Sequence, residues 1–131
     1  MFWGASFKKR YSELHDEPQI ELEVHNCFHP AFSTCSFLID SGSSTTAINE
    51  EVFDILNLQY SRQVPVEYAD SGQGMRDTCF INLRFPQLGY EEKQLEVIIH
   101  PDKSQNLLGR DILNKMSLFL YGKKRVLKIK V

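Results

Sequence analysis

One acidic residue comes directly after an apolar run in the first third of the chain. Residues 37–39 are apolar and lead into Asp40, which is followed by Ser41, Gly42 and Ser43. Burying a lone carboxylate is costly unless it is hydrogen-bonded or shares a proton. Glycine lets the backbone approach closely and take an unusual turn, and the serines place hydroxyl groups beside the acid. A carboxylate held in this way can act as a general base on water.

A similar element occurs near the other end of the chain. Leu107, Leu108 and Gly109 form a brief apolar step, and the residues after them predict a short helix over 110–116. The order of apolar strand, glycine-containing step and short helix therefore occurs twice.

Short strands make up most of the remaining chain. Residues 19–25 alternate apolar and polar side chains, which indicates a half-buried strand. Asn49 is a suitable N-cap for a helix that continues to about Leu58. Further strands are predicted over residues 35–39, 45–48, 64–69, 78–85, 95–99, 117–121 and 125–131. This pattern indicates an all-β fold with a closed or sandwiched sheet.

The chain is expected to hold one domain. Residues 1–17 are weakly patterned and are interpreted as an N-terminal arm, and residues 18–131 as the domain itself. Residues 70–74 are rich in glycine and are the predicted tip of a long hairpin.

Composition narrows the classes of function. With 131 residues, 42% of them hydrophobic, and a formal net charge of -2, the chain is expected to be ordered and not to bind nucleic acid. No apolar run approaches the roughly 20 residues that span a bilayer, so we expect a soluble protein that does not bind a membrane. The start of the chain does not read as a secretory signal. Three cysteines indicate a reducing compartment, and hence a cytoplasmic location.

The two glycine-containing elements together resemble a known family. Asp40-Ser41-Gly42-Ser43 after an apolar strand is similar to the catalytic motif of aspartic proteases. Residues 107–113 are similar to the second hydrophobic-hydrophobic-Gly element of the retropepsin-like group. The resemblance covers about residues 18–131. It implies the acid-protease fold, a closed β-barrel with a flap hairpin and one or two short helices.

The resemblance implies a role for each residue of the first motif. Asp40 would be the catalytic carboxylate, and Ser41 would join the hydrogen bonds that brace two active-site loops. Gly42 would allow the turn and present its backbone to the carboxylate and the substrate. Ser43 would lie beside the carboxylate, where a hydroxyl can donate to the ionised acid. We therefore expect a more acidic activity optimum than in a relative with alanine there, which the pH–rate profile of Ser43→Ala would test.

Three further positions follow from the same resemblance. Gly72, Gln73 and Gly74 would form the flap over the substrate. Leu108 and Gly109 would pack beneath the catalytic loop. Retroviral members pair the residue equivalent to Arg110 with an acid soon after the catalytic triplet. Residues 43–46 contain no acid here, so that ion pair is absent or made elsewhere.

The mechanism of the family needs two aspartates, and this chain offers one such motif. Asp111 is the obvious second candidate, but in the family its position begins the helix and is structural. The resemblance therefore implies a homodimeric aspartic endopeptidase in which each copy supplies Asp40. Its substrates would be extended peptides or proteins, and no cofactor or metal is implied. The alternative is a non-catalytic dimerisation or peptide-binding module on the same fold.

Other residues leave alternatives open. His25, Cys27 and His29 alternate like metal ligands, although a proline-containing turn favours a solvated hairpin. Cys27 and Cys35 flank the same hairpin and could form a disulfide outside the cytosol. The basic residues of 123–130 could form a nucleic-acid or acidic-membrane patch, but their alternation with apolar residues favours an amphipathic strand in a dimer sheet.

Overall fold

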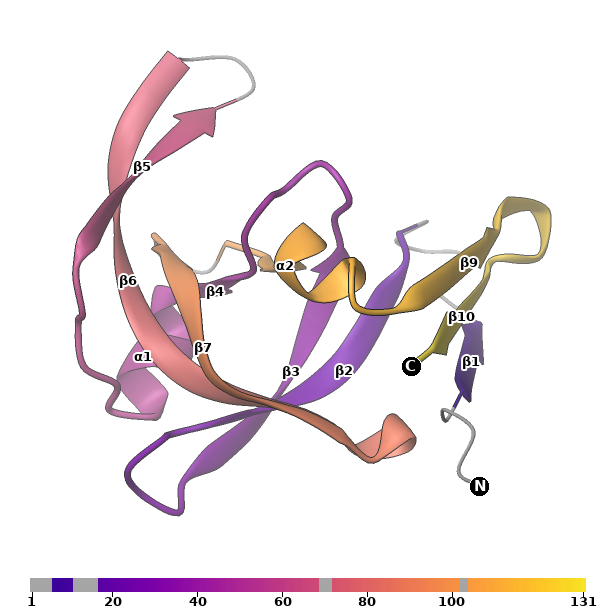
Figure 1. Cartoon of the computed structure of the whole chain (residues 1–131), viewed down its shortest axis with the longest axis horizontal. Helices are drawn as coiled ribbons and strands as arrows, with labels where there is room; N and C mark the ends of the chain where they lie inside the picture. Colours follow the sequence, from indigo (N-terminus) through magenta and orange to yellow (C-terminus); the bar gives the residue numbers. More distant parts are fainter. Residues whose placement is uncertain (1–5, 11–16, 69–71, 102–103) are drawn as a thin grey trace.

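Six strands of the computed structural model form a closed barrel (Figure 1). The structure describes residues 6–10, 17–68, 72–101 and 104–131. Its larger sheet contains β2 (Gln19–His25), β3 (Phe32–Ile39), β4 (Ala47–Asn49), β5 (Gln63–Tyr68), β6 (Gly72–Phe85), β7 (Tyr90–His100) and β8 (Asn106–Leu108). The hydrogen-bonded order is β2-β3-β8-β4-β7-β6-β5. The barrel closes because residues 23–25 of β2 also pair with residues 82–84 of β6, which leaves β5 outside the ring.

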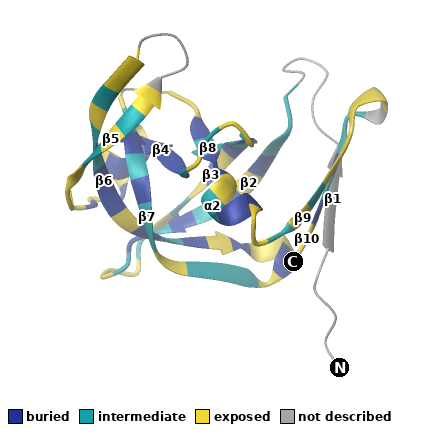
Figure 2. Ribbon diagram, turned by 45° about the horizontal axis from the view of Figure 1, so that its top comes forward, coloured by how far each residue is buried: buried dark blue, intermediate teal, exposed yellow. Residues whose placement is uncertain are grey.

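The barrel wall follows the alternation that the sequence predicts. Ile20, Leu22 and Val24 on β2 are fully buried, whereas the residues between them are exposed or half-buried. Burying a side chain of this size contributes roughly 1.5–3 kcal/mol. Figure 2 shows buried residues along the barrel strands and exposed residues at the far end of the β5–β6 hairpin. The prediction of a closed, mostly β fold is confirmed.

The first helix, α1 (Glu50–Ile55), begins where the sequence predicts. The side chain of Asn49 accepts a hydrogen bond from the Val52 N–H at 2.9 Å, as an N-cap does. The helix ends before the predicted Leu58 because Asn57 adopts a left-handed conformation, with φ of 51°. Asparagine tolerates this conformation better than most residues. The second helix, α2 (Arg110–Leu113), is a single turn rather than the predicted 110–116.

A second sheet stands beside the barrel. It contains β1 (Ser6–Arg10), β10 (Val126–Lys130) and β9 (Ser117–Tyr121), all antiparallel, in the order β1-β10-β9. Leu127 and Ile129 of β10 are fully buried and join the barrel core, whereas Lys130 is exposed. The predicted amphipathic strand is therefore confirmed.

Strand β1 corrects one prediction. Residues 6–10 were expected in a weakly patterned arm, yet they pair along their whole length with residues 126–130. A strand that depends on a partner at the other end of the chain needs no strong local pattern. Residues 1–5 and 11–16 of the predicted arm lie outside the described residues.

Two 3-10 turns complete the fold, η1 (Pro86–Leu88) between β6 and β7 and η2 (Gly122–Lys124) between β9 and β10. Within the described residues, neither α-helix has the length and apolar character that a membrane-spanning helix needs.

Asn106 ties three strands together inside the barrel. Its side-chain oxygen accepts from the Asn49 N–H at 2.9 Å, and its amide nitrogen donates to the Ser36 carbonyl at 3.2 Å. We expect Asn106→Ala to lower the free energy of unfolding by about 2 kcal/mol, because the buried Asn49 N–H loses its hydrogen-bond partner and the Ser36 carbonyl loses a donor. Urea denaturation followed by circular dichroism measures the loss. The matched control is Asn114→Ala at an exposed position, which should cost less than about 0.5 kcal/mol. Equal effects of the two substitutions would contradict this account.

Candidate active site

Asp40 lies one residue beyond β3, and backbone groups fix its position. Its N–H donates to the Leu108 carbonyl at 3.0 Å, which extends the parallel pairing of β3 and β8 by one step. Its carboxylate oxygen Oδ1 accepts from the Gly42 N–H at 3.0 Å. The Ser43 N–H donates to the Asp40 carbonyl at 3.2 Å and closes the turn. The carboxylate is half-buried, so it is held in place while it remains accessible.

The contacts of the turn explain why position 42 is a glycine. A Cβ atom there would lie 3.2 Å from Oδ1 of Asp40, tighter than ordinary van der Waals contact. A side chain would therefore press on the carboxylate that the Gly42 N–H binds. The absence of a side chain lets this N–H approach the carboxylate.

Thr46 joins the Asp40 loop to α2. Its hydroxyl donates to Oδ1 of Asp111 at 2.7 Å and accepts from the Gly109 N–H at 3.1 Å. Its N–H donates to Oδ2 of Asp111 at 3.0 Å. Asp111 also accepts from the Ile112 N–H at 2.9 Å, so both of its carboxylate oxygens are occupied. This geometry agrees with the structural role expected for Asp111.

Gly109 makes the close approach that this joint requires. A Cβ atom on Gly109 would lie 2.6 Å from the carbonyl carbon of Thr45 and 2.9 Å from the Thr46 nitrogen. Real Cβ atoms do not come so close to backbone, so only glycine fits without moving the loop. Leu108 beside it is fully buried. The role of Leu108 and Gly109 as structural support beneath the loop stays a prediction.

Arg110 braces the Asp40 loop through backbone carbonyl groups, and no acidic partner for it is found in the described part of the chain. Its Nη1 donates to the Ser41 carbonyl at 2.8 Å, and its backbone N–H donates to the Ser43 carbonyl at 2.8 Å. The missing acid after the triplet is thus replaced by two carbonyl groups of the loop. The Ser41 side chain is exposed.

The hydroxyl of Ser43 differs from the expectation. It donates to the Thr45 carbonyl at 2.7 Å rather than to the Asp40 carboxylate. This hydrogen bond stabilises the loop but gives no direct stabilisation to an ionised Asp40. The expected shift of the activity optimum to more acidic pH depended on a hydrogen bond from Ser43 to the Asp40 carboxylate, and the Ser43 hydroxyl does not make that bond.

Gly72, Gln73 and Gly74 lie in the first residues of β6 rather than at the hairpin tip. They pair with residues 66–68 of β5, and the connecting residues 69–71 lie outside the described part of the chain. In Figure 1 the end of this hairpin and the loop between β3 and β4 both lie at the top. The hairpin is thus at the same end of the barrel as Asp40, and the substrate contact of these residues stays a prediction.

An ion pair fixes the base of the hairpin. Arg62 donates from Nε and Nη2 to the two carboxylate oxygens of Glu96 at 2.8 and 2.7 Å, and the Thr78 hydroxyl adds a third hydrogen bond at 2.8 Å. The bonds from Arg62 and then Thr78 lower the pKa of Glu96 to about 2. The carboxylate therefore stays ionised at the acidic and neutral pH values where such a site would be tested.

Two of the three possible metal ligands, His25 and Cys27, are engaged in other contacts. His25 stacks on Phe32 with ring centroids 4.8 Å apart, and its Nε2 lies 2.8 Å from a carboxylate oxygen of Glu23. No cluster of His, Cys, Asp or Glu suited to a metal ion occurs among the described residues. All three cysteines are free thiols, and Cys27 donates to Asn82 rather than pairing with Cys35.

The sequence matches the family model described as aspartyl protease over residues 23–112. The chain belongs to the aspartyl protease family. The matched region contains both glycine-containing elements and the hairpin between them. A protease-type function is therefore the class that the family supports. A search of curated protein sequences finds no significant match.

Solved structures of retropepsin-like proteases share the fold. A retropepsin-like aspartic protease from Rickettsia conorii superposes with a TM-score of 0.61 and 16% sequence identity, covering 96% of this chain and 90% of that one. EIAV protease in complex with the inhibitor HBY-793 superposes with a TM-score of 0.57 and 15% identity, covering 80% of this chain and 92% of that one. The expected retropepsin-like fold is confirmed.

Sequence reasoning missed the importance of Thr46 in this member of the aspartyl protease family. Thr45 and Thr46 are neighbours of the same type, yet Thr46 is fully buried and Thr45 is half-buried. Strand alternation gave no signal here, because Thr46 and all three residues of β4 are buried, so buried residues do not alternate with exposed ones.

We expect Thr46→Val to lower the free energy of unfolding by about 2–3 kcal/mol, because the Gly109 N–H and one Asp111 oxygen lose a buried partner. Denaturation in urea measures this loss. Thr45→Val is the matched control, since no hydrogen bond from the Thr45 hydroxyl is found in the described part of the chain. It should cost less than about 0.5 kcal/mol. A similar loss in both variants would show that the joint does not depend on the Thr46 hydroxyl.

We expect Ser43→Ala to leave the acidic limb of the pH–rate profile unchanged, because the Ser43 hydroxyl binds a carbonyl and not the carboxylate. Losing the bond to Thr45 should lower stability by about 1 kcal/mol. Profiles of the two proteins with one peptide substrate, measured alongside their urea denaturation, check both statements. A clear shift of the acidic limb would instead support a direct hydrogen bond between the Ser43 hydroxyl and the Asp40 carboxylate.

Proposed function

We propose that two copies of this chain form an aspartic endopeptidase in which each copy supplies Asp40. The observation that carries the proposal is the placement of half-buried Asp40 at one end of the barrel: its backbone N–H donates to the Leu108 carbonyl, and its carboxylate accepts from the Gly42 N–H. Gly42 and the Arg110 brace keep the turn in one conformation. A reacting group fixed by its surroundings suits catalysis better than a mobile one, because less order must be created in the transition state.

The chemistry requires two carboxyl groups that share one proton. Two carboxylates at close range cannot both ionise, so one remains protonated. The ionised member takes a proton from water as the water oxygen attacks the peptide carbonyl carbon. The protonated member gives its proton to the carbonyl oxygen. Collapse of this intermediate breaks the carbon–nitrogen bond. The amine leaves with the proton that the first carboxyl group took from water, and a hydroxyl proton of the intermediate returns to the other carboxyl group.

A second copy is the natural source of the second carboxyl group. Asp111 has both oxygens occupied by Thr46 and Ile112, so it is committed to structure. Strand β9 ends the sheet order β1-β10-β9 and has one edge without a strand partner in the described chain. It also exposes about half of each of Phe119, Leu120 and Tyr121. An apolar strand at a sheet edge favours pairing with another chain.

The substrate in this proposal is an extended peptide beneath the β5–β6 hairpin. Gly72, Gln73 and Gly74 would contact the peptide backbone, and a strand-like peptide suits recognition through main-chain hydrogen bonds. No cofactor is required, because water and the two carboxyl groups supply every proton. The three free thiols support a reducing compartment such as the cytoplasm.

We expect Asp40→Asn to abolish peptide cleavage, because an amide cannot accept the proton from water. Cleavage of a peptide library is measured from acidic to neutral pH. The control Asp54→Asn removes an exposed carboxylate from α1 and should cleave like the unsubstituted protein. When equal amounts of the Asp40→Asn variant and the unsubstituted chain exchange freely at constant total concentration, activity should fall to roughly one quarter, since both copies must supply Asp40.

Two outcomes would overturn the proposal. Cleavage that survives Asp40→Asn would show that Asp40 is not the catalytic residue. A fall of the activity to one half on mixing would show that each copy acts alone. A well-formed dimer in analytical ultracentrifugation that cleaves nothing would instead favour the alternative, a dimerisation or peptide-binding module.

A further inference from the structure

A pocket of about 520 Å³ lies away from the candidate active site. Its lining includes the turn between β2 and β3, the segment after α1 and parts of β6 and β7. Strand β3 begins next to that turn and ends just before Asp40, and its eight residues span roughly 25 Å. The pocket is therefore at the opposite end of the barrel from Asp40.

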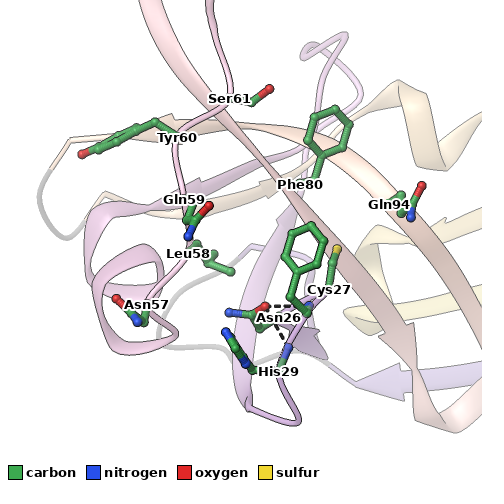
Figure 3. A pocket seen from close by; sticks show the side chains of 11 residues that line it. Asn26, Cys27, His29, Asn57, Leu58, Gln59, Tyr60, Ser61, Phe80 and Gln94 are labelled. Carbon is green, nitrogen blue, oxygen red and sulfur yellow. Dashed lines mark hydrogen bonds between the residues drawn. The ribbon is translucent and has the colours of Figure 1, made fainter.

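The pocket combines apolar surfaces with amide groups. Phe28, Leu58 and Phe80 are its apolar lining, and Asn57, Gln59 and Gln94 add amide side chains. Figure 3 shows Leu58 and Gln59 on one side and Phe80 and Gln94 on the other. No Asp, Glu, Lys or Arg is among the 11 lining residues. Burial raises the pKa of the Cys27 thiol, so this group also stays uncharged near neutral pH.

The walls of the pocket are fixed by hydrogen bonds. Buried Asn26 accepts from the Phe28 and His29 N–H groups at 2.8 and 3.2 Å and donates to the Leu56 carbonyl at 3.0 Å. This side chain joins the β2–β3 turn to the segment after α1. Asn82 in turn accepts from the Gln94 N–H at 2.9 Å and from the Cys27 thiol at 3.4 Å. A pocket held in this way does not have to be ordered on binding.

Strand β6 has an unpaired position at this pocket. The N–H and carbonyl of Thr78 bond to Arg62 and Ser61, and Asn82 pairs with His25 of β2. Because backbone groups alternate in direction along a strand, those of Phe80 point to the same side as those of Thr78 and Asn82. Neither β2 nor β5 reaches this position. Neither group of Phe80 has a partner on that side among the described residues.

We propose that this pocket binds a short, extended and uncharged peptide segment, one residue of which pairs with the Phe80 backbone. The segment's N–H donates to the Phe80 carbonyl, and its carbonyl accepts from the Phe80 N–H. These are the two bonds of an ordinary antiparallel pair. The site does not depend on Asp40 or on any cleavage reaction.

The same pairing selects the side chain of the bound residue. The Phe80 side chain points away from the core and is 42% exposed, and Phe28 is 81% exposed. Residues opposite each other in an antiparallel pair project their side chains to the same face of the sheet. A large apolar side chain of the peptide therefore packs beside Phe80 and Phe28, where it removes apolar surface from water. A charged side chain of the peptide finds no Asp, Glu, Lys or Arg in the lining to pair with.

The test is a titration of nitrogen-15-labelled protein carrying Asp40→Asn, which cannot consume the probe by the proposed reaction. The probe is acetyl-threonyl-phenylalanyl-threonine N-methylamide. We expect the Phe80 amide resonance to move progressively as the probe is added. N-methylation of the central phenylalanine removes the donor, so affinity should fall roughly fivefold. Replacing that phenylalanine with glutamate should weaken binding at least as much.

Two protein variants, one inside the pocket lining and one outside it, serve as test and control in the same titration. Phe28→Ser removes an exposed aromatic ring from the pocket and should weaken binding roughly fivefold. Phe32→Ser removes a ring that is 55% exposed near the same turn but outside the lining, and it should leave the affinity unchanged. Since both rings are largely exposed, both variants should stay folded, which the nitrogen-15 spectrum reports directly.

Three results would overturn the proposal. A Phe80 amide resonance that stays in place at saturating probe would exclude the backbone pairing. Equal affinity of the N-methylated probe would do the same without any change to the protein. Benzyl alcohol that binds the pocket as tightly as the peptide would assign it to small aromatic molecules instead.

Discussion

The arrangement of the candidate active site depends on a joint between the two glycine-containing elements. The buried Thr46 hydroxyl donates to Asp111 and accepts from the Gly109 N–H. Water cannot replace these partners inside the barrel, so a shift of one element against the other would leave polar groups unsatisfied. The contact distance at Gly109 adds a steric condition, because the backbone of the Asp40 loop occupies the space that a side chain would need. Together these conditions fix α2 against the loop that carries Asp40.

The pairing of barrel strands also fixes the backbone position of Asp40. Strands β3 and β8 pair in parallel, and the bond from the Asp40 N–H to Leu108 continues their pairing past the end of β3. The β5–β6 hairpin is supported differently, since among the described residues β5 pairs with β6 and with no other strand. Its base is held by the Arg62–Glu96 ion pair, while its far end extends beyond the barrel. A fixed carboxylate at the barrel end that also carries a less supported hairpin suits the proposed site, which must admit an extended chain.

Local patterns predicted the parts of this fold that local forces decide. The alternation of residues 19–25 and the capping side chain of Asn49 were sufficient, because burial and capping act within a few residues. The strand at residues 6–10 exists through its pairing with β10, which no local pattern records. The motif containing Asp40 could be recognised from residue types and spacing. The direction of the Ser43 hydroxyl could not, because two acceptors lie within reach and only the folded loop decides between them.

Because both oxygens of Asp111 are hydrogen-bonded, Asp40 is the one carboxyl group of the two that is available for the reaction. The number of available carboxyl groups therefore bears on how many copies of the chain the site needs. An acid–base mechanism on a peptide bond needs one group that accepts a proton and another that donates one. Asp40 can be either, but one carboxyl group cannot be both in the same step. Both oxygens of Asp111 accept from Thr46, and Oδ1 also accepts from the Ile112 N–H of its own helix, so releasing Asp111 for chemistry would break the joint that positions Asp40. A second copy that meets the first at the Asp40 end avoids this conflict. Such a copy also leaves the pocket at the opposite end of the barrel free to bind a separate peptide segment.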